Sequence, residues 1–368
     1  MSTAPVFPAP LSFRKPPQRI LVVITRRIGD VLLATPVLRS LKDAWPQAAI
    51  DVLVFAGTQG FLMGNPDVRR VMTVPERPAL GAHLKLLRDI ARRYDLALSL
   101  LPGDRPTLYA WIAGKRSVGL QLGDRKSVWK RWLLDAWVPF DGIATHTVRM
   151  HLALLASVGV APAARVLACW TPEDERLVDT LLAPLENARF AVLHPYPKFR
   201  YKMWTAGGWT EVGTWLREQG WQVVFTGGPG AEERAYNEMI ARRIDGALDL
   251  TGRLGLGAVA LVLARAAVYV GPDTAITHAA AALGVPTVAL FGPTNPVKWG
   301  PWPSGHPLES NPWVQTGSQA YRHVRLIQGA GVCVPCGQEG CERHVESSSD
   351  CLTSLPAERV IEAIRDLI

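Results

Sequence analysis

The chain has 368 residues, of which 48% are hydrophobic and 20% charged, and its formal net charge is +8. This length favours two domains, and these proportions exclude a disordered chain and a membrane-embedded one. The positive charge indicates an anionic partner, and without a zinc-finger, homeodomain or RNP-type signature we expect a phosphorylated substrate or membrane surface, not nucleic acid.

The first half alternates short apolar runs with helical patterns, as a parallel α/β sheet requires. Residues 1–19 are proline-rich, without the apolar run of a secretory signal, and predict a flexible tail on a cytoplasmic protein. The run ILVVIT, 20–25, predicts a buried strand, and a Gly29-Asp30 turn then leads into a helix ending near Trp45. Further strands are predicted from Ile50 and at 71–74 and 96–101, with a helix at 84–93.

The second half repeats this alternation from Arg189 onward, so we predict two doubly wound Rossmann-like domains facing a cleft, a GT-B type arrangement. The predicted boundaries are a first domain over 20–165, a linker over 166–188, a second domain over 189–355 and a C-terminal helix over 356–368. In such sheets ligands bind at the carboxyl ends of the strands, which is where the chemistry is expected.

The segment VYVGPDTAITHAAAALGVPTVALFGPT, 268–294, carries the strongest signal. A strand leads into Asp273 and Thr274, which begin a helix carrying His278 near its start. Unpaired N–H groups and the positive dipole end of such a helix can hold a diphosphate. A structural alternative has Asp273 or Thr274 as a simple helix cap and His278 as a core histidine.

This segment resembles the donor site of the family that transfers heptose from ADP-heptose to lipopolysaccharide, glycosyltransferase family 9. The opening ILVVITRRIGDVLLATPVLRSLKDAWPQAAIDVLV and the block VLHPYPKFRYKMWTAGGWTEV are also similar to that family. Two further stretches, QLGDRKSVWKRW and THTVRMHLALLASVGV, resemble the branch that adds the third inner-core heptose.

The resemblance implies an inverting transfer with Asp30 as the general base and Lys202 against the donor phosphates. It implies further donor contacts from Asp273, Thr274, Ala275 and His278, and a ribose contact from Glu232 or Glu233, while Lys198 would supply charge to the donor from a loop that differs from that of the family. Asp30 as a helix cap and Lys202 as a solvated surface lysine are the structural alternatives. The sequence departs from the family at Ala275, often glycine, and at Pro197-Lys198, where relatives often have hydroxyl residues.

Four cysteines near the end of the chain, Cys333, Cys336, Cys341 and Cys351, follow a C-x2-C-x4-C-x9-C spacing. In a cytoplasmic protein such a cluster favours a structural metal site over disulfides, although the spacing is not a standard zinc pattern and reduced thiols are the alternative. No cofactor is expected for catalysis.

The implied partners are ADP-heptose, a phosphorylated lipid A-inner core acceptor and the cytoplasmic surface of the inner membrane. Arg26, Arg27, Arg105, Lys115, Arg116 and Lys126 lie in or near predicted loops of the first domain, where the acceptor's charges could be bound. The alternatives are a nucleotide-sugar epimerase of the same architecture, a transferase with another donor or a protein acceptor, and a non-catalytic binding protein.

Overall fold

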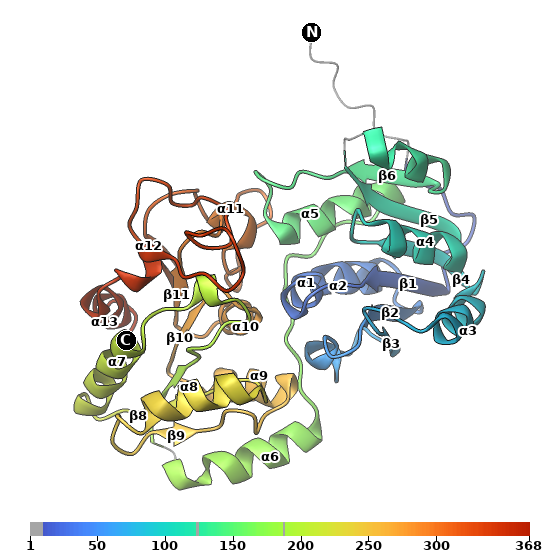
Figure 1. Cartoon of the computed structure of the whole chain (residues 1–368). Helices are drawn as coiled ribbons and strands as arrows, with labels where there is room; N and C mark the ends of the chain where they lie inside the picture. The colour runs from blue at the N-terminus through green and yellow to red at the C-terminus, as the bar shows by residue number, and fades with distance from the viewer. Residues whose placement is uncertain (1–9, 123–124, 187) are drawn as a thin grey trace. The chain divides into compact units, whose positions relative to one another are not determined.

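The computed structural model describes residues 10–122, 125–186 and 188–368 (Figure 1). The chain divides into two compact units, the first ending at Leu167 and the second beginning at Ala168. Most of the predicted tail, residues 1–9, lies outside the described residues. No described helix has both the length and the apolar character needed to cross a bilayer.

The first unit is built on a six-stranded sheet in the order β3-β2-β1-β4-β5-β6, with every pairing parallel. Its strands are β1 (Arg19–Ile24), β2 (Ala49–Phe55), β3 (Arg70–Val74), β4 (Tyr94–Ser99), β5 (Gly114–Gln121) and β6 (Ala136–Pro139). Its α-helices are α1 (Ile28–Leu33), α2 (Thr35–Ala44), α3 (Leu80–Ile90), α4 (Asp104–Ala113) and α5 (Thr147–Ala153). This is a doubly wound sheet, because the strand order reverses between β1 and β4.

The second unit has a seven-stranded sheet in the order β12-β13-β11-β10-β7-β8-β9. Its strands are β7 (Phe190–Leu193), β8 (Gln222–Phe225), β9 (Leu248–Asp249), β10 (Val268–Pro272), β11 (Thr287–Phe291), β12 (Gln319–Tyr321) and β13 (Val324–Gln328). All pairings are parallel except that of β12 with β13. The order reverses between β7 and β10, so the second unit has the winding of the first.

The helices of the second unit pack on this sheet and on one another. They are α6 (Pro172–Leu182), α7 (Ala206–Glu218), α8 (Ala231–Ala241), α9 (Leu256–Arg265), α10 (Ala275–Leu283), α11 (Pro296–Trp299), α12 (Asp350–Thr353) and α13 (Ala357–Arg365). The core combines the inner residues of β7, β8, β10 and β11 with apolar faces of α7 and α13, including the buried Trp204 and Trp209 in edge contact.

The structure confirms two doubly wound α/β units, and it differs from the sequence prediction in detail. The predicted linker contains α6, whose Thr171 N-cap forms a reciprocal capping box with Asp174. Because α6 packs on α9 and Asp179 pairs with Arg265 at 2.7 Å, this segment belongs to the body of the second unit. The single helix predicted after β1 is two helices, α1 and α2.

Candidate active site

Both units place predicted site residues where their strand order reverses. In the first unit Asp30 follows β1, and the N–H of Leu100 after β4 donates to Val23 of β1. In the second, Lys202 lies in the segment after β7 and Asp273 directly after β10. At such a switch point the connections on either side run in opposite directions and leave a crevice for a ligand.

Asp30 lies in the first turn of α1 and is only 5% exposed. Its Oδ1 lies 3.3 Å from Nε of Arg26, whose own side chain is half exposed. A carboxylate in the first turn also interacts favourably with the helix dipole, so the same side chain stabilises α1. Asp30 is thus held in place at the carboxyl edge of the sheet, where ligands bind in folds of this kind, and this position suits a proton acceptor.

The basic residues predicted to meet the acceptor do not all lie at that edge. Arg26 and Arg27 follow β1 and are exposed, and Arg105 lies in the first turn of α4, donating to the carbonyl of Glu76 at 2.6 Å. The prediction that Lys115 and Arg116 lie in or near a loop is wrong: β5 directly follows α4, and these residues lie at its start, at the opposite edge, where they pair with Asp95 and Asp135. The side chain of Lys126 lies outside the described residues.

Lys202 and Asp273 form the central pair of the second unit. Nζ of Lys202 donates to Oδ2 of Asp273 at 2.5 Å, and both side chains are largely buried. Burial raises the pKa of the Asp273 carboxyl, but Lys202, His278 and Thr294 together lower that pKa by more. The pKa of Asp273 therefore lies below its usual range. The lysine is therefore fixed by a charged partner and is no freely solvated surface residue.

His278 lies one turn into α10 and is 4% exposed. Burial lowers the pKa of its imidazole to about 4, a shift that the nearby Asp273 opposes and Lys202 reinforces. The ring is therefore neutral at pH 7, and its Nδ1 makes no hydrogen bond to any described residue. A buried ring nitrogen in that condition is able to bind a polar group of a ligand.

The start of α10 is a capped helix terminus that rests on closely packed residues of β10. Thr274 is the N-cap, with its side chain accepting from the N–H of Thr277, and Thr274 and Ala275 are both half-buried. Beneath them the hydroxyls of Tyr269 and Thr277 lie 2.9 Å apart. A Cβ at Gly271 would lie 2.0 Å from the Tyr269 hydroxyl, so only glycine fits there. The N–H groups in the first turn of a helix have no partner within the helix, so this end of α10 can bind an anion.

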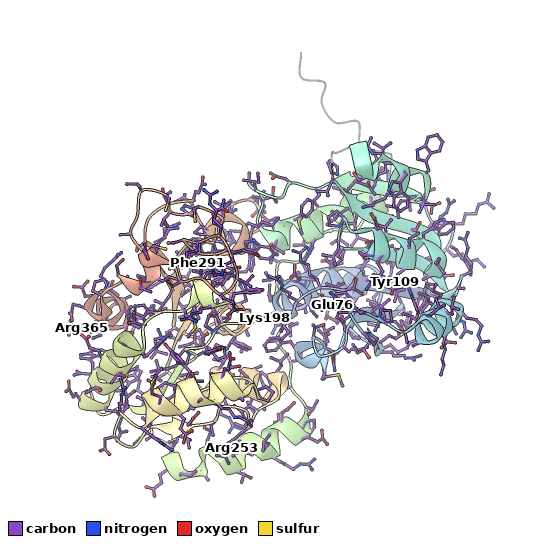
Figure 2. All side chains as sticks on the ribbon, viewed as in Figure 1. Glu76, Tyr109, Lys198, Arg253, Phe291 and Arg365 are labelled. Atoms are coloured by element: carbon purple, nitrogen blue, oxygen red, sulfur yellow. The ribbon has the colours of Figure 1, made fainter. Side chains whose placement is uncertain are left out.

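The other predicted donor residues come from two loops. Lys198, labelled in Figure 2, is exposed after β7 with its Nζ 5.8 Å from the ring centre of Phe199. Glu232 is exposed in the first turn of α8 and accepts from the Tyr196 hydroxyl at 3.2 Å. Its neighbour Glu233 is committed elsewhere, since it accepts from the N–H of Gly228 at 2.6 Å and closes the Gly-rich turn.

A second polar group at the same edge was not predicted. His194 follows β7 and Thr226 follows β8, and His194 Nδ1 lies 3.0 Å from the Thr226 hydroxyl. Asn237 joins them by donating to the Thr226 carbonyl and to the Thr251 hydroxyl. Burial lowers the pKa of His194 to about 4. Its position directly after a buried strand is the signal that could have revealed it.

The four cysteines gather near α12 without forming disulfides. Burial, and then the thiols of Cys336, Cys341 and Cys333, raise the pKa of the Cys351 thiol to about 11. Across residues 10–122, 125–186 and 188–368, no three His, Cys, Asp or Glu side chains are arranged to hold a metal ion. The metal site stays a prediction, and no chemistry is assigned to it.

Comparisons with known proteins agree on one family. The profile of glycosyltransferase family 9 (heptosyltransferase) matches residues 84–312. Lipopolysaccharide heptosyltransferase 3 of Escherichia coli K12 is 28% identical to this chain, over 74% of this chain and 82% of the relative.

Two solved structures share the fold. A family 9 glycosyl transferase from Veillonella parvula superposes with a TM-score of 0.76 at 20% identity, over 95% of this chain and 97% of that one. The E. coli ADP-heptose lipopolysaccharide heptosyltransferase II superposes with a TM-score of 0.72 at 22% identity, over 95% and 98%. These likenesses confirm the GT-B fold class, and the family profile favours a transferase over the epimerase alternative.

Proposed function

The chain belongs to glycosyltransferase family 9 (heptosyltransferase), and on this premise we propose that it transfers L-glycero-D-manno-heptose from ADP-heptose to the inner core of lipopolysaccharide. That it is a glycosyltransferase of lipopolysaccharide core synthesis follows from the family. The donor and the inner-core step are our proposal, supported by the names of the relatives with which it shares sequence and fold.

The observation that carries the proposal is the Lys202–Asp273 pair beside the start of α10. A diphosphate bound there would meet the helix N–H groups and one ammonium group, which together offset the charge that grows on ADP as it leaves. The ion pair with Asp273 would hold Lys202 in position for this role. Thr274 and Ala275 would supply backbone N–H groups, while Glu232 and Lys198 would contact outer parts of the donor.

On the acceptor side, we assign Asp30 as the general base. The acceptor hydroxyl oxygen forms a bond to the anomeric carbon as the bond from that carbon to the diphosphate breaks, and the hydroxyl proton passes to the Asp30 carboxylate. Attack from the face opposite the leaving group inverts the anomeric configuration. The reaction is a substitution in which no electrons are gained or lost, so the proposal includes no redox cofactor.

The acceptor proposed is the phosphorylated lipid A-inner core, at the cytoplasmic face of the inner membrane. Arg26 and Arg27 are exposed directly after β1, next in sequence to the Asp30 turn, and suit contacts with its phosphates or carboxylates. The relative named heptosyltransferase 3 supports the step that adds the third heptose, the branch the sequence resembles.

The test is to incubate the purified protein with a panel of nucleotide sugars and with lipopolysaccharides truncated at successive heptoses. We expect ADP release only when ADP-heptose and one truncated acceptor are both present, with the product heavier by one heptose by mass spectrometry. Equal turnover of another nucleotide sugar would overturn the donor assignment, and interconversion of free nucleotide sugar would overturn transfer altogether.

A further inference from the structure

The segment between β5 and β6 (Figure 1) contains a 3-10 helix, η2 (Arg125–Trp132), which buries polar side chains and exposes large apolar ones. Side chains three apart share a row in a 3-10 helix. One row, Ser127 and Lys130, is buried, while the next two rows expose Val128 with Arg131 and Trp129 with Trp132. A surface helix of a soluble domain normally buries its apolar row and exposes its polar one.

Specific contacts hold η2 in this orientation. Nζ of Lys130 pairs with Asp104 at 2.7 Å and donates to the carbonyl of Pro102, so the ammonium group is directed inward. The guanidinium of Arg131 lies 4.2 Å from the ring centre of Trp137 in β6. The outward position of the apolar side chains is therefore fixed by the fold of the first unit.

The outward side chains are large. Trp132 is 86% exposed, and Trp129 and Val128 are 41% and 40% exposed. An indole left in water keeps a large apolar surface exposed to solvent. Tryptophan next to basic residues is common where proteins contact the headgroup layer of a membrane. We call Val128, Trp129, Arg131 and Trp132 the η2 face.

The charge of the first unit fits an anionic surface. Up to Leu167 the sequence has 23 Lys and Arg against 11 Asp and Glu, a formal charge of +12, whereas from Ala168 it has 17 against 21, a charge of −4. The η2 sequence RKSVWKRW has four basic residues and no acidic one. Basic segments are attracted to bilayers rich in anionic lipid, and this attraction weakens with salt.

We propose that the η2 face is a membrane-docking surface that inserts its two indoles among the headgroups of an anionic phospholipid bilayer. The observation behind it is the outward apolar row on a basic unit, and it requires no particular sugar donor. In docking, the enzyme would bring its first unit to the surface where a lipid-linked acceptor resides.

The test is co-sedimentation of the full chain with phosphatidylcholine vesicles and with vesicles containing one-third phosphatidylglycerol. We expect binding to the anionic vesicles alone, falling as NaCl rises, and about tenfold weaker binding for the W129A/W132A double variant. The matched control is Trp111→Ala, which removes an exposed tryptophan of α4 and should leave vesicle binding unchanged. Circular dichroism and a thermal melt check that each variant is folded.

Two further measurements distinguish docking on lipid from a loss of transfer activity. Tryptophan fluorescence should be quenched by brominated lipid in the wild type and less in W129A/W132A. Turnover of a deacylated, water-soluble acceptor should be the same in both proteins, so failure to dock and failure to transfer are distinguishable. Unchanged vesicle binding by the folded double variant would overturn the proposal. If light scattering showed a wild-type dimer that the double variant converts to a monomer with vesicle binding retained, the η2 face would be a contact between two copies of the chain, and the proposal would also be overturned.

Discussion

The two units share one winding order but carry different chemistry where that order reverses. In the first unit a buried carboxylate, Asp30, lies 3.3 Å from a half-exposed arginine. In the second, a lysine, a carboxylate and a neutral histidine meet beside the start of a nine-residue helix. The formal charges of the units also differ in sign, +12 against −4.

Neither the fold nor the net charge of a unit determines which side chains stand at its switch point. The second unit is net acidic, yet its switch point has Lys202 and a helix N-terminus, the features that suit a diphosphate. The first unit is net basic, yet the residue at its switch point is a carboxylate. Local residues set the chemistry, while net charge acts over longer distances on charged surfaces.

Removing the carboxylate of the first unit is the change expected to have the largest effect. Asp30→Asn should lower the transfer rate roughly 10³-fold, because no group is left to accept the hydroxyl proton. Binding of ADP, measured by calorimetry, should be unchanged, because the nucleotide is assigned to the second unit. An equal loss of ADP binding would remove the division of roles between the units.

Removing the cation of the second unit should affect both binding and turnover. Lys202→Met should lower kcat/KM roughly 10²-fold and weaken ADP binding, since charge on the leaving diphosphate is no longer offset. It should also destabilise the fold by about 3 kcal/mol, because Asp273 is left buried without its partner. Lys198→Met, in the same segment but exposed, is the matched control and should show a smaller loss of binding and no loss of stability in urea unfolding.

The buried histidines of the second unit predict sensitivity to acid. His194 and His278 have pKa values of about 4, so unfolding lets each take up a proton near pH 6.5. Stability should therefore fall as the pH drops from 6.5 towards 4, by about 2 kcal/mol per histidine between pH 7 and 5. His278→Gln should remove its share of this dependence in urea unfolding, and an unchanged pH dependence would contradict the assignment.

The smallest expected effect comes from removing a helix N-cap, and it distinguishes a capping role from a role in ligand binding. Thr274→Ala and Thr171→Ala each remove an N-cap hydroxyl in the second unit, and each should cost about 1 kcal/mol of stability. Only Thr274→Ala should also weaken ADP binding, because α10 and not α6 begins at the switch point. Equal ADP binding by the two variants would place the diphosphate elsewhere.

Much of the fold was predictable because buried parallel strands are short apolar runs bounded by turns. The runs at β1, β2, β4, β10 and β11 have this pattern, and all five strands are present. The site residues that follow β1, β7 and β10 could be placed, for the same reason, at the carboxyl edge of the sheet to which each strand belongs. Their roles came from resemblance to a family, because an apolar strand pattern does not specify which group a neighbouring side chain binds.

Other features depend on tertiary contacts that no local pattern contains. The strand β5 begins Gly-Lys-Arg, an unpromising sequence for a sheet, and its charges are tolerated because Asp95 and Asp135 pair with them. The inward direction of Lys130 depends on Asp104, a residue of another element. The pairing of Lys202 with Asp273 joins residues 71 positions apart.

The packing of α6 on α9 decides where this protein could be cut into autonomously folding halves. A Cβ at Gly257 of α9 would lie 2.4 Å from the Asp174 carboxylate, so α6 and α9 approach closely at this point. A fragment that starts at Arg189 would lack α6, and the apolar side of α9 that α6 covers would then be exposed to solvent. Starting at Ala168 retains the cover, so we expect that fragment to be the one that can be purified and titrated with nucleotide by itself.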